Sequence, residues 1–180
     1  LNVQHNHKDG SIGKPVNGCD VKILGNDGIE LKEGEKGLLY IKSNTVMKGY
    51  YNEEPLKSDW FCTGDMAYMD KDKNVFFVDR EKRIIKIAGV NVFPQEIENV
   101  VNSIDEVEVS CAKEVIINEK PAIKLFVQLS QGIVLSSPLE NKIKNEIASK
   151  LLKYSIPSII TQVNNMPLTA IGKVDFNKVN

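Results

Sequence analysis

The sequence predicts a mixed fold, in which a small β-barrel-like subdomain over residues 1–79 precedes an α+β domain over residues 80–180. Three observations support this prediction. Short strand patterns separated by Gly-rich turns fill the first part. A charged step, Glu81-Lys82-Arg83, then interrupts the pattern. Beyond it, apolar residues recur at helical spacing between further strand patterns, which is typical of a small sheet covered by helices.

Three strands are predicted in the first part, over residues 21–24, 37–42 and 75–78. Turn clusters follow the first of them, as Gly25-Asn26-Asp27-Gly28, and precede the last, over residues 70–74. Short strands with such turns favour a small barrel or a curled sheet. We place the boundary to the second part between Asp79 and Lys82.

The second part is predicted to hold four strands and two helices. The strands cover residues 84–87, 107–115, 122–129 and 159–163, and the first of them ends at Gly89. One helix covers residues 95–103, with Pro94 at its first position. The other starts at Ser137, whose hydroxyl is expected to cap it, with Pro138 in the first turn and Glu140 completing a capping box. Its apolar stripe is Leu139, Ile143, Ile147 and Leu151.

The composition predicts a packed chain, with 42% hydrophobic and 26% charged residues. A formal net charge of −1 argues against a general nucleic-acid binder. No run approaches the roughly 20 apolar residues that span a bilayer, and the first residues lack the apolar core of a signal peptide. Three widely spaced cysteines, Cys19, Cys62 and Cys111, favour reduced thiols in the cytoplasm. His5 and His7 lack a third ligand nearby, so no metal site is predicted.

Four stretches carry candidate chemistry, and two of them lie in the first part. Residues 10–18 are glycine-rich but lack the Gly-Lys-Ser/Thr ending of a P-loop, which favours a turn. In Trp60-Phe61-Cys62-Thr63-Gly64-Asp65, a carboxylate follows a glycine and can accept two hydrogen bonds, as a ribose diol would donate. The alternative for Asp65 is an aspartate in a turn.

The other two stretches lie at and after the boundary. Residues 79–98 place four cations beside a strand broken by glycine, which suits a phosphate-bearing ligand, and the alternative is a solvated charged linker. These cations are Arg80, Lys82, Arg83 and Lys86. Residues 167–175 present Lys173 after Gly172. The missing upstream glycine argues against a Walker A loop, and so does Val174, which cannot ligate Mg²⁺. The lysine could still reach into a site from outside.

Taken in order, with Met47-Lys48-Gly49-Tyr50-Tyr51-Asn52 between them, the four stretches resemble the adenylate-forming superfamily. That superfamily contains acyl-CoA synthetases, peptide-synthetase adenylation domains and beetle luciferases. The resemblance runs from Gly10 to Asp175. It implies that a carboxylic acid attacks the α-phosphate of Mg-ATP, and that a thiol, usually of coenzyme A, then displaces AMP from the acyl-adenylate. It also implies that residues 1–79 end a large AMP-binding domain, and that residues 80–180 form a mobile lid with two poses.

The resemblance assigns roles to individual residues. Asp65 matches a ribose-binding aspartate and Arg80 an arginine that assists it. Lys82 matches the hinge, which is Asp or Lys in this family. Lys173 matches the lysine that bridges the carboxylate and α-phosphate oxygens during adenylation. The loop that lines the thiol channel in the second pose corresponds to Lys86, Ala88 and Gly89.

Departures from the family pattern shape the functional hypothesis. The phosphate-binding Ser/Thr/Gly-Lys loop, the Mg²⁺-binding Glu motif and the acid pocket are expected upstream of Leu1. We therefore expect the chain alone to be inactive, as a fragment of an ATP-dependent acid:CoA ligase. One alternative is an adenylation domain that loads a carrier-protein thiol, although no Gly-x-Asp-Ser motif is present. The other is a non-catalytic binding module. The acid and the oligomeric state stay open.

Overall fold

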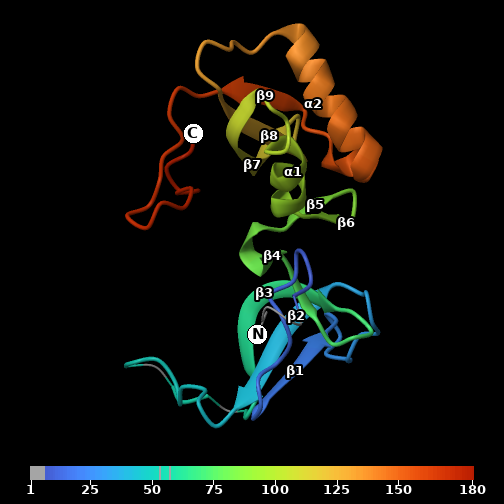
Figure 1. Cartoon of the computed structure of the whole chain (residues 1–180), viewed down its shortest axis with the longest axis vertical. Coiled ribbons are helices and arrows are strands. Elements are labelled where there is room, and N and C mark those ends of the chain that lie inside the picture. The colour runs from blue at the N-terminus through green and yellow to red at the C-terminus, as the bar shows by residue number, and fades with distance from the viewer. Residues whose placement is uncertain (1–6, 53, 57) are drawn as a thin grey trace. The chain divides into compact units, whose positions relative to one another are not determined.

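The computed structural model describes residues 7–52, 54–56 and 58–180, which group into two compact units (Figure 1). The first unit extends to Lys82 and the second begins at Arg83. A short 3₁₀ helix, Glu81–Arg83, carries the chain from one unit into the other. Each unit has its own core, and each is described separately below.

The first unit is a four-stranded antiparallel meander in the order β1-β2-β3-β4. Its strands are β1 (Cys19–Leu24), β2 (Gly37–Ser43), β3 (Phe61–Met69) and β4 (Val75–Arg80). The three predicted strands are therefore confirmed, whereas β3 was not predicted. The buried residues Ile23, Leu39, Ala67 and Val75 form the core of the sheet. Closure into a barrel-like shape stays a prediction.

The glycine-rich segment before β1 pairs with the first residue of the edge strand β4. The Ile12 N–H donates to the Val75 carbonyl at 2.8 Å, and the Val75 N–H donates to the Gly13 carbonyl at 2.9 Å. Gly13 and Val75 thus form an antiparallel bridge beside β4. The sequence interpretation of this segment as a turn accounts for Gly10 and Gly13, whose φ angles are +76° and +97°.

The second unit begins with a hairpin of β5 (Ile85–Ile87) and β6 (Val90–Val92). A three-stranded sheet follows, in the order β7-β8-β9, from β7 (Val107–Ile117), β8 (Lys120–Leu129) and β9 (Ile159–Gln162). Strands β7 and β8 are antiparallel, and β9 is parallel to β8. The helices are α1 (Pro94–Val101) and α2 (Ser137–Lys150), and a 3₁₀ turn covers Lys153–Ser155. All six predicted elements are present, and β6 was missed.

The start of α2 differs from the prediction in its capping. The residue that precedes the helix is Ser136, and its side chain makes no capping hydrogen bond. Ser137 already lies in the first turn, so its hydroxyl is not the cap and the predicted capping box is wrong. Leu139, Ile143 and Ile147 are buried as predicted, but Leu151 follows the last helical turn with φ −125° and ψ 170°.

The two faces of the three-stranded sheet are covered differently. On one face, Ala112, Ile123 and Leu125 pack with apolar residues of α1 and α2, as the sequence predicted. Because successive side chains on a strand point to opposite faces, Cys111 and Phe126 face the other way. There they pack against Met166, Val174, Phe176 and Val179. Residues 163–179, which we call the C-terminal segment, therefore cover the second face.

Candidate functional site

Asp65 and Arg80 are cross-strand partners in the first unit. They pair directly in the register of β3 and β4, and Nη1 of Arg80 lies 2.9 Å from Oδ1 of Asp65. The same Nη1 donates a hydrogen bond to the Thr63 carbonyl at 3.2 Å. The Arg80 side chain is 60% exposed and that of Asp65 is 22% exposed. The turn interpretation of Asp65 is therefore wrong, since the residue lies in a strand and is held by its neighbour.

An irregularity in β3 sets the direction of the Asp65 side chain. Leu38 pairs with Met66 and Tyr40 with Cys62, so three residues of β3 face the single residue Leu39. Gly64 sits at the middle of this bulge with φ +72°. Bulges of this kind re-aim side chains and are frequent beside active sites. The conformation requires a left-handed residue, which explains the glycine before the aspartate.

Thr63 fixes the bulge from inside. Its hydroxyl donates to the Leu39 carbonyl at 3.0 Å and accepts the Asp65 N–H at 3.1 Å. The hydroxyl thus replaces part of the interrupted strand pairing. The sequence alone assigns no role to Thr63, because a single threonine carries no local signal of this kind.

The Asp65 carboxylate is an acceptor with spare capacity. Oδ1 is buried and receives no hydrogen bond from the described residues, although the Arg80 charge lies within 2.9 Å of it. The attraction between the two residues is therefore electrostatic rather than directional. A buried acceptor without a donor costs about 1–3 kcal/mol. Oδ1 itself is closed to solvent, so a ligand would have to meet the exposed remainder of the Asp65 side chain.

Lys173 lies on a tight hairpin within the C-terminal segment. Leu168 and Val174 form an antiparallel bridge, and between them Thr169 and Lys173 exchange two hydrogen bonds. The Thr169 N–H donates to the Lys173 carbonyl at 2.7 Å, and the Lys173 N–H donates to the Thr169 hydroxyl at 3.2 Å. Gly172, with φ +80°, allows the reversal. Lys173 is exposed, so a closed turn presents a cation at its tip.

The predicted thiol-channel residues share the β5–β6 hairpin. Ile87 pairs with Val90, which leaves Ala88 and Gly89 as a two-residue turn with φ angles of +50° and +80°. Positive φ at both positions is the pattern of a type I′ turn. Lys86 is exposed on β5, beside this turn. The sequence had ended a strand at Gly89, whereas the chain reverses there into β6.

Lys82 is exposed at the middle of the 3₁₀ helix Glu81–Arg83, and the boundary between the two units follows it directly. Among the predicted site residues, the structure thus brings Asp65 to Arg80 and groups Lys86 with Ala88 and Gly89. Lys173 stands on a separate turn. Residues that sequence reasoning left without a partner include Arg83 and Glu98, which form a buried ion pair.

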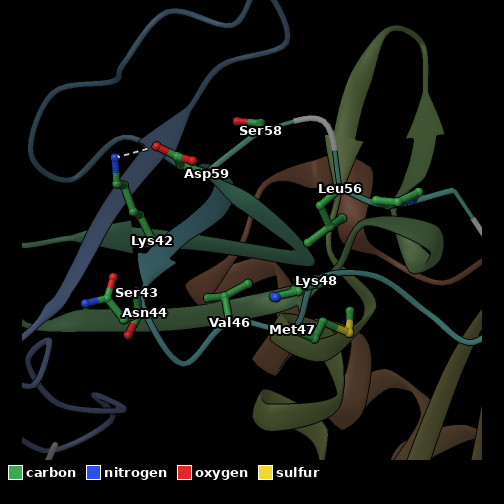
Figure 2. A pocket seen from close by; sticks show the side chains of 10 residues that line it. Lys42, Ser43, Asn44, Val46, Met47, Lys48, Leu56, Ser58 and Asp59 are labelled. Carbon is green, nitrogen blue, oxygen red and sulfur yellow. Dashed lines mark hydrogen bonds and ion pairs between the residues drawn. The ribbon is translucent and has the colours of Figure 1, made fainter.

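A hollow of about 640 Å³ lies in the first unit, next to the end of β2 (Figure 2). Met47 and Lys48, which begin the quoted Met-Lys-Gly-Tyr-Tyr-Asn motif, line it. On its wall, Nζ of Lys42 lies 2.9 Å from Oδ2 of Asp59. None of the predicted site residues lines this hollow, so the motif and the Asp65–Arg80 pair are separate features of the unit.

The described residues offer no metal site of their own. No group of three or more His, Cys, Asp or Glu side chains is placed to hold an ion in the described part of the chain. His5 lies outside the described residues, and Nδ1 of His7 is 3.1 Å from the Asp9 carboxylate. No helix within residues 7–52, 54–56 and 58–180 is long and apolar enough to cross a membrane.

The three cysteines are free thiols. Burial raises the pKa of Cys111 to about 12, so this group stays protonated and unreactive at neutral pH. Cys62 hydrogen-bonds to Tyr40 and thereby raises the pKa of the phenol above its ordinary value. The buried Cys111 is therefore not an activated nucleophile, and the charged residues above are the candidates for chemistry.

Known proteins share this sequence pattern and fold. A family model described as AMP-binding enzyme matches residues 1–51. A long-chain-fatty-acid–CoA ligase from Haemophilus influenzae is 35% identical over 180 residues, covering 96% of this chain and 30% of that protein. The chain is thus similar in sequence to AMP-binding enzymes and to acid:CoA ligases. A 2-succinylbenzoate–CoA ligase from Oceanobacillus iheyensis is 34% identical over 173 residues, covering 93% of this chain and 34% of that protein.

A solved structure of another CoA ligase has a similar fold. The anthranilate CoA ligase AuaEII, in complex with anthranoyl-AMP, superimposes with a TM-score of 0.87 at 26% identity, covering 96% of this chain and 35% of that one. The chain therefore spans about a third of the length of the ligases it matches. None of the predicted site residues falls within the range matched by the family model, so their roles depend on the geometry described above.

Proposed function

We propose that the chain is part of an ATP-dependent acid:CoA ligase, which we call the complete ligase. In the first half-reaction a carboxylate oxygen attacks the α-phosphorus of ATP, and pyrophosphate leaves. In the second, the sulfur of coenzyme A attacks the acyl carbon, and AMP leaves. Residues 1–79 are assigned to the end of the AMP-binding domain and residues 80–180 to a mobile domain. The chain alone is expected to be inactive because it spans about a third of its relatives.

The observation that best supports this function is the bulge that aims Asp65. Its Oδ1 is buried 2.9 Å from Nη1 of Arg80, while 22% of the Asp65 side chain stays exposed and can be reached by a ligand. A ribose diol supplies two adjacent hydroxyl donors, which match a carboxylate with free lone pairs. Hydrogen bonds to a charged group contribute about 1.5–3 kcal/mol each. We therefore assign Asp65 to the ribose of ATP, with Arg80 holding it in place.

Lys173 is assigned to the adenylation step. Negative charge gathers on the α-phosphate and carboxylate oxygens as the new bond forms, and a fixed ammonium group stabilises it. The closed hairpin from Leu168 to Val174 supplies the required preorganisation, since the lysine is exposed at its tip while the backbone of its turn is hydrogen-bonded.

The second half-reaction is assigned to the other pose of the mobile domain. Lys82 is the hinge, in keeping with its place directly before the boundary between the two units. The turn at Ala88 and Gly89 would then line the path of the thiol, with Lys86 beside it. The tight type I′ geometry keeps bulky side chains away from the tip of this hairpin.

Mg²⁺ does not fit a site made from this chain alone, because the described residues contain no cluster of ligands for it. We assign no step of the chain's chemistry to the metal. Its ligands are expected elsewhere in the complete ligase, where Mg²⁺ would accompany ATP.

The acyl acceptor and the acid are further parts of the proposal. Coenzyme A is favoured over a carrier protein because the relatives are CoA ligases at 34–35% identity. A non-catalytic module is disfavoured, since it gains nothing from an exposed lysine on a closed turn.

Fatty, aromatic and short-chain acids all stay candidates, with fatty acids first because one relative acts on them. We also retain the cytoplasmic location predicted from the cysteines.

The test is a panel of carboxylic acids offered to the complete ligase with ATP and coenzyme A. The expected products are AMP, pyrophosphate and an acyl-CoA thioester in equal amounts. Formation of AMP and pyrophosphate with release of free acid, but thioester only when a carrier protein is added, would favour the carrier-loading alternative. Absence of ATP turnover with every acid would contradict the proposal.

A further inference from the structure

We propose that Arg83 and Phe176 are positioning residues that fix the Lys173 hairpin to the body of the second unit. The proposal rests on the adenylation role assigned to Lys173 above. It concerns residues on three segments far apart in the sequence: the start of the unit, helix α1 and the C-terminal segment.

Arg83 is held by a buried carboxylate. Its Nη2 lies 2.6 Å from Oε1 of Glu98 on α1, and the two side chains are 16% and 6% exposed. The same oxygen of Glu98 accepts the Ala112 N–H at 2.9 Å, on the edge strand β7. The buried Glu98 carboxylate accepts from two donors and is well compensated. Removal of Arg83 or Glu98 would leave the charge of the other buried and unpaired. The guanidinium is thus fixed between α1 and β7.

The guanidinium in turn covers the ring of Phe176. Cζ of Arg83 lies 3.7 Å from the centroid of this ring, which is a close cation–π arrangement. Phe176 follows Lys173 by three residues and packs with Val174 against Cys111 and Phe126. Nearby, Nζ of Lys113 donates to the carbonyls of Phe176 and Val179 at 3.0 and 2.6 Å. The end of the segment is therefore tied to both α1 and β7.

The hairpin is anchored on its other side as well. The Met166 N–H donates to Oε1 of Gln128 on β8 at 2.6 Å, and the Asp175 N–H closes the base by donating to the Pro167 carbonyl at 2.8 Å. Lys173 thus projects from a turn whose two ends are attached to the sheet. Loss of the Phe176 attachment would free one end and widen the range of positions that the lysine explores.

The clamp also connects the proposed hinge to the catalytic lysine. Arg83 is the first residue of the second unit and directly follows Lys82. A rotation about Lys82 would carry Arg83, and with it the ring of Phe176 and the hairpin, as one body. The positioning role therefore predicts that weakening the Arg83–Phe176 contact affects the reaction only through Lys173.

The first test uses the 180-residue chain and measures amide hydrogen exchange. Phe176→Leu keeps an apolar side chain but removes the ring face, and Phe176→Tyr keeps the ring. We expect Phe176→Leu to speed exchange at Gly172, Lys173 and Asp175 by about 3- to 10-fold, with little change in α1. Phe176→Tyr should restore protection. Unchanged exchange in the hairpin, or equal acceleration throughout the second unit, would overturn the clamp.

The second test uses the complete ligase and measures adenylation by ATP–pyrophosphate exchange. Phe176→Leu should lower kcat about 3- to 10-fold, with the KM for ATP nearly unchanged, and Phe176→Tyr should recover it. In a Lys173→Ala background the same change should have no further effect. An equal loss in that background would overturn the positioning role. If Lys173→Ala alone left adenylation unchanged, the proposed role of Lys173 would fail, while hydrogen exchange would still decide whether the clamp exists.

Discussion

Nη1 of Arg80 lies 2.9 Å from Oδ1 of Asp65, and the two residues are direct partners across β3 and β4. The bulge at Gly64 leaves this carboxylate oxygen buried without a donor from the described residues. The pair therefore holds the Asp65 carboxylate in one place, with 22% of the side chain exposed to a ligand. This combination is the basis of the predictions for nucleotide binding.

Replacing Asp65 with Asn in the complete ligase should weaken ATP binding. The amide has no charge and offers one acceptor oxygen in place of two, so about 1.5–3 kcal/mol is lost per ribose hydrogen bond. We expect the KM for ATP to rise about 10- to 100-fold, measured by pyrophosphate exchange. Asp27→Asn, at an exposed turn of the same unit, is the matched control and should leave KM unchanged. A normal KM in Asp65→Asn would refute the ribose assignment.

Alanine substitutions at Gly64 and Gly132 separate the cost of backbone strain from the effect on the Asp65 side chain. Their φ angles are +72° and +82°, and a Cβ at either position would meet no atom within 4 Å. Alanine at each should therefore cost about 1 kcal/mol through backbone strain alone, which lowers Tm by about 2–4 °C. Calorimetry of the chain checks this result.

The two glycine variants should differ in function. Gly64→Ala alters the bulge that aims Asp65 and should raise the KM for ATP in the complete ligase, whereas Gly132→Ala should not. Equal KM values in both variants would mean that the bulge has no part in orienting the carboxylate.

Replacing Lys82 with Pro should hinder the rotation of the mobile domain. Proline fixes φ near −65° and also restricts the preceding Glu81, so the hinge can no longer change its backbone angles freely. At least one half-reaction should slow, as measured by single-turnover adenylation and by transfer from a preformed adenylate. Lys82→Ala removes the charge but keeps the freedom of φ, and it should affect the rates less. Normal rates for both half-reactions in Lys82→Pro would show that the hinge lies elsewhere.

The turn between β3 and β4 should give the first unit a pH-dependent stability. Nζ of Lys8 lies 2.8 Å from Oδ2 of Asp70, and this bond lowers the pKa of Asp70 below its ordinary value of 3.8. A carboxyl group whose pKa is lower in the folded state stabilises the fold at pH values above its unfolded pKa. This stabilisation is lost as the pH falls through the folded pKa. Asp70→Asn should therefore lower Tm at pH 7, and the difference from wild type should shrink below about pH 4. A constant difference across this range would argue against the ion pair.

Much of the fold was predictable because the strands and helices follow local patterns. Partial alternation and the following turn cluster indicate β1, and four-residue spacing indicates the buried stripe of α2. Strand β3 was missed because Thr63-Gly64-Asp65 interrupts the alternation where the bulge occurs. Strand β6 is not predicted because Gly89 indicates the end of a strand, whereas Ala88 adopts a positive φ beside it and the chain reverses there.

The parts of the site that depend on distant residues could not be predicted. Arg83 and Glu98 are 15 positions apart, and their ion pair exists only because α1 packs on β7. The contact between Arg83 and Phe176 joins residues near the two ends of the second unit's sequence. The sequence groups Arg83 with three other cations suited to a phosphate-bearing ligand or a solvated linker, whereas the structure pairs it with Glu98 and buries most of its side chain. The motif residues themselves were found, but their supporting contacts were not.

The most direct test of the account separates the two half-reactions in Lys173→Ala. Adenylation of the acid by the complete ligase should slow about 10²- to 10³-fold, because one preorganised cation is removed from the transition state. Transfer to coenzyme A from a preformed acyl-adenylate should stay within a few-fold of the normal rate. Lys178→Ala, an exposed lysine of the same segment, serves as the control and should leave both rates unchanged. Equal losses in both half-reactions of Lys173→Ala, or no loss of adenylation, would contradict the account.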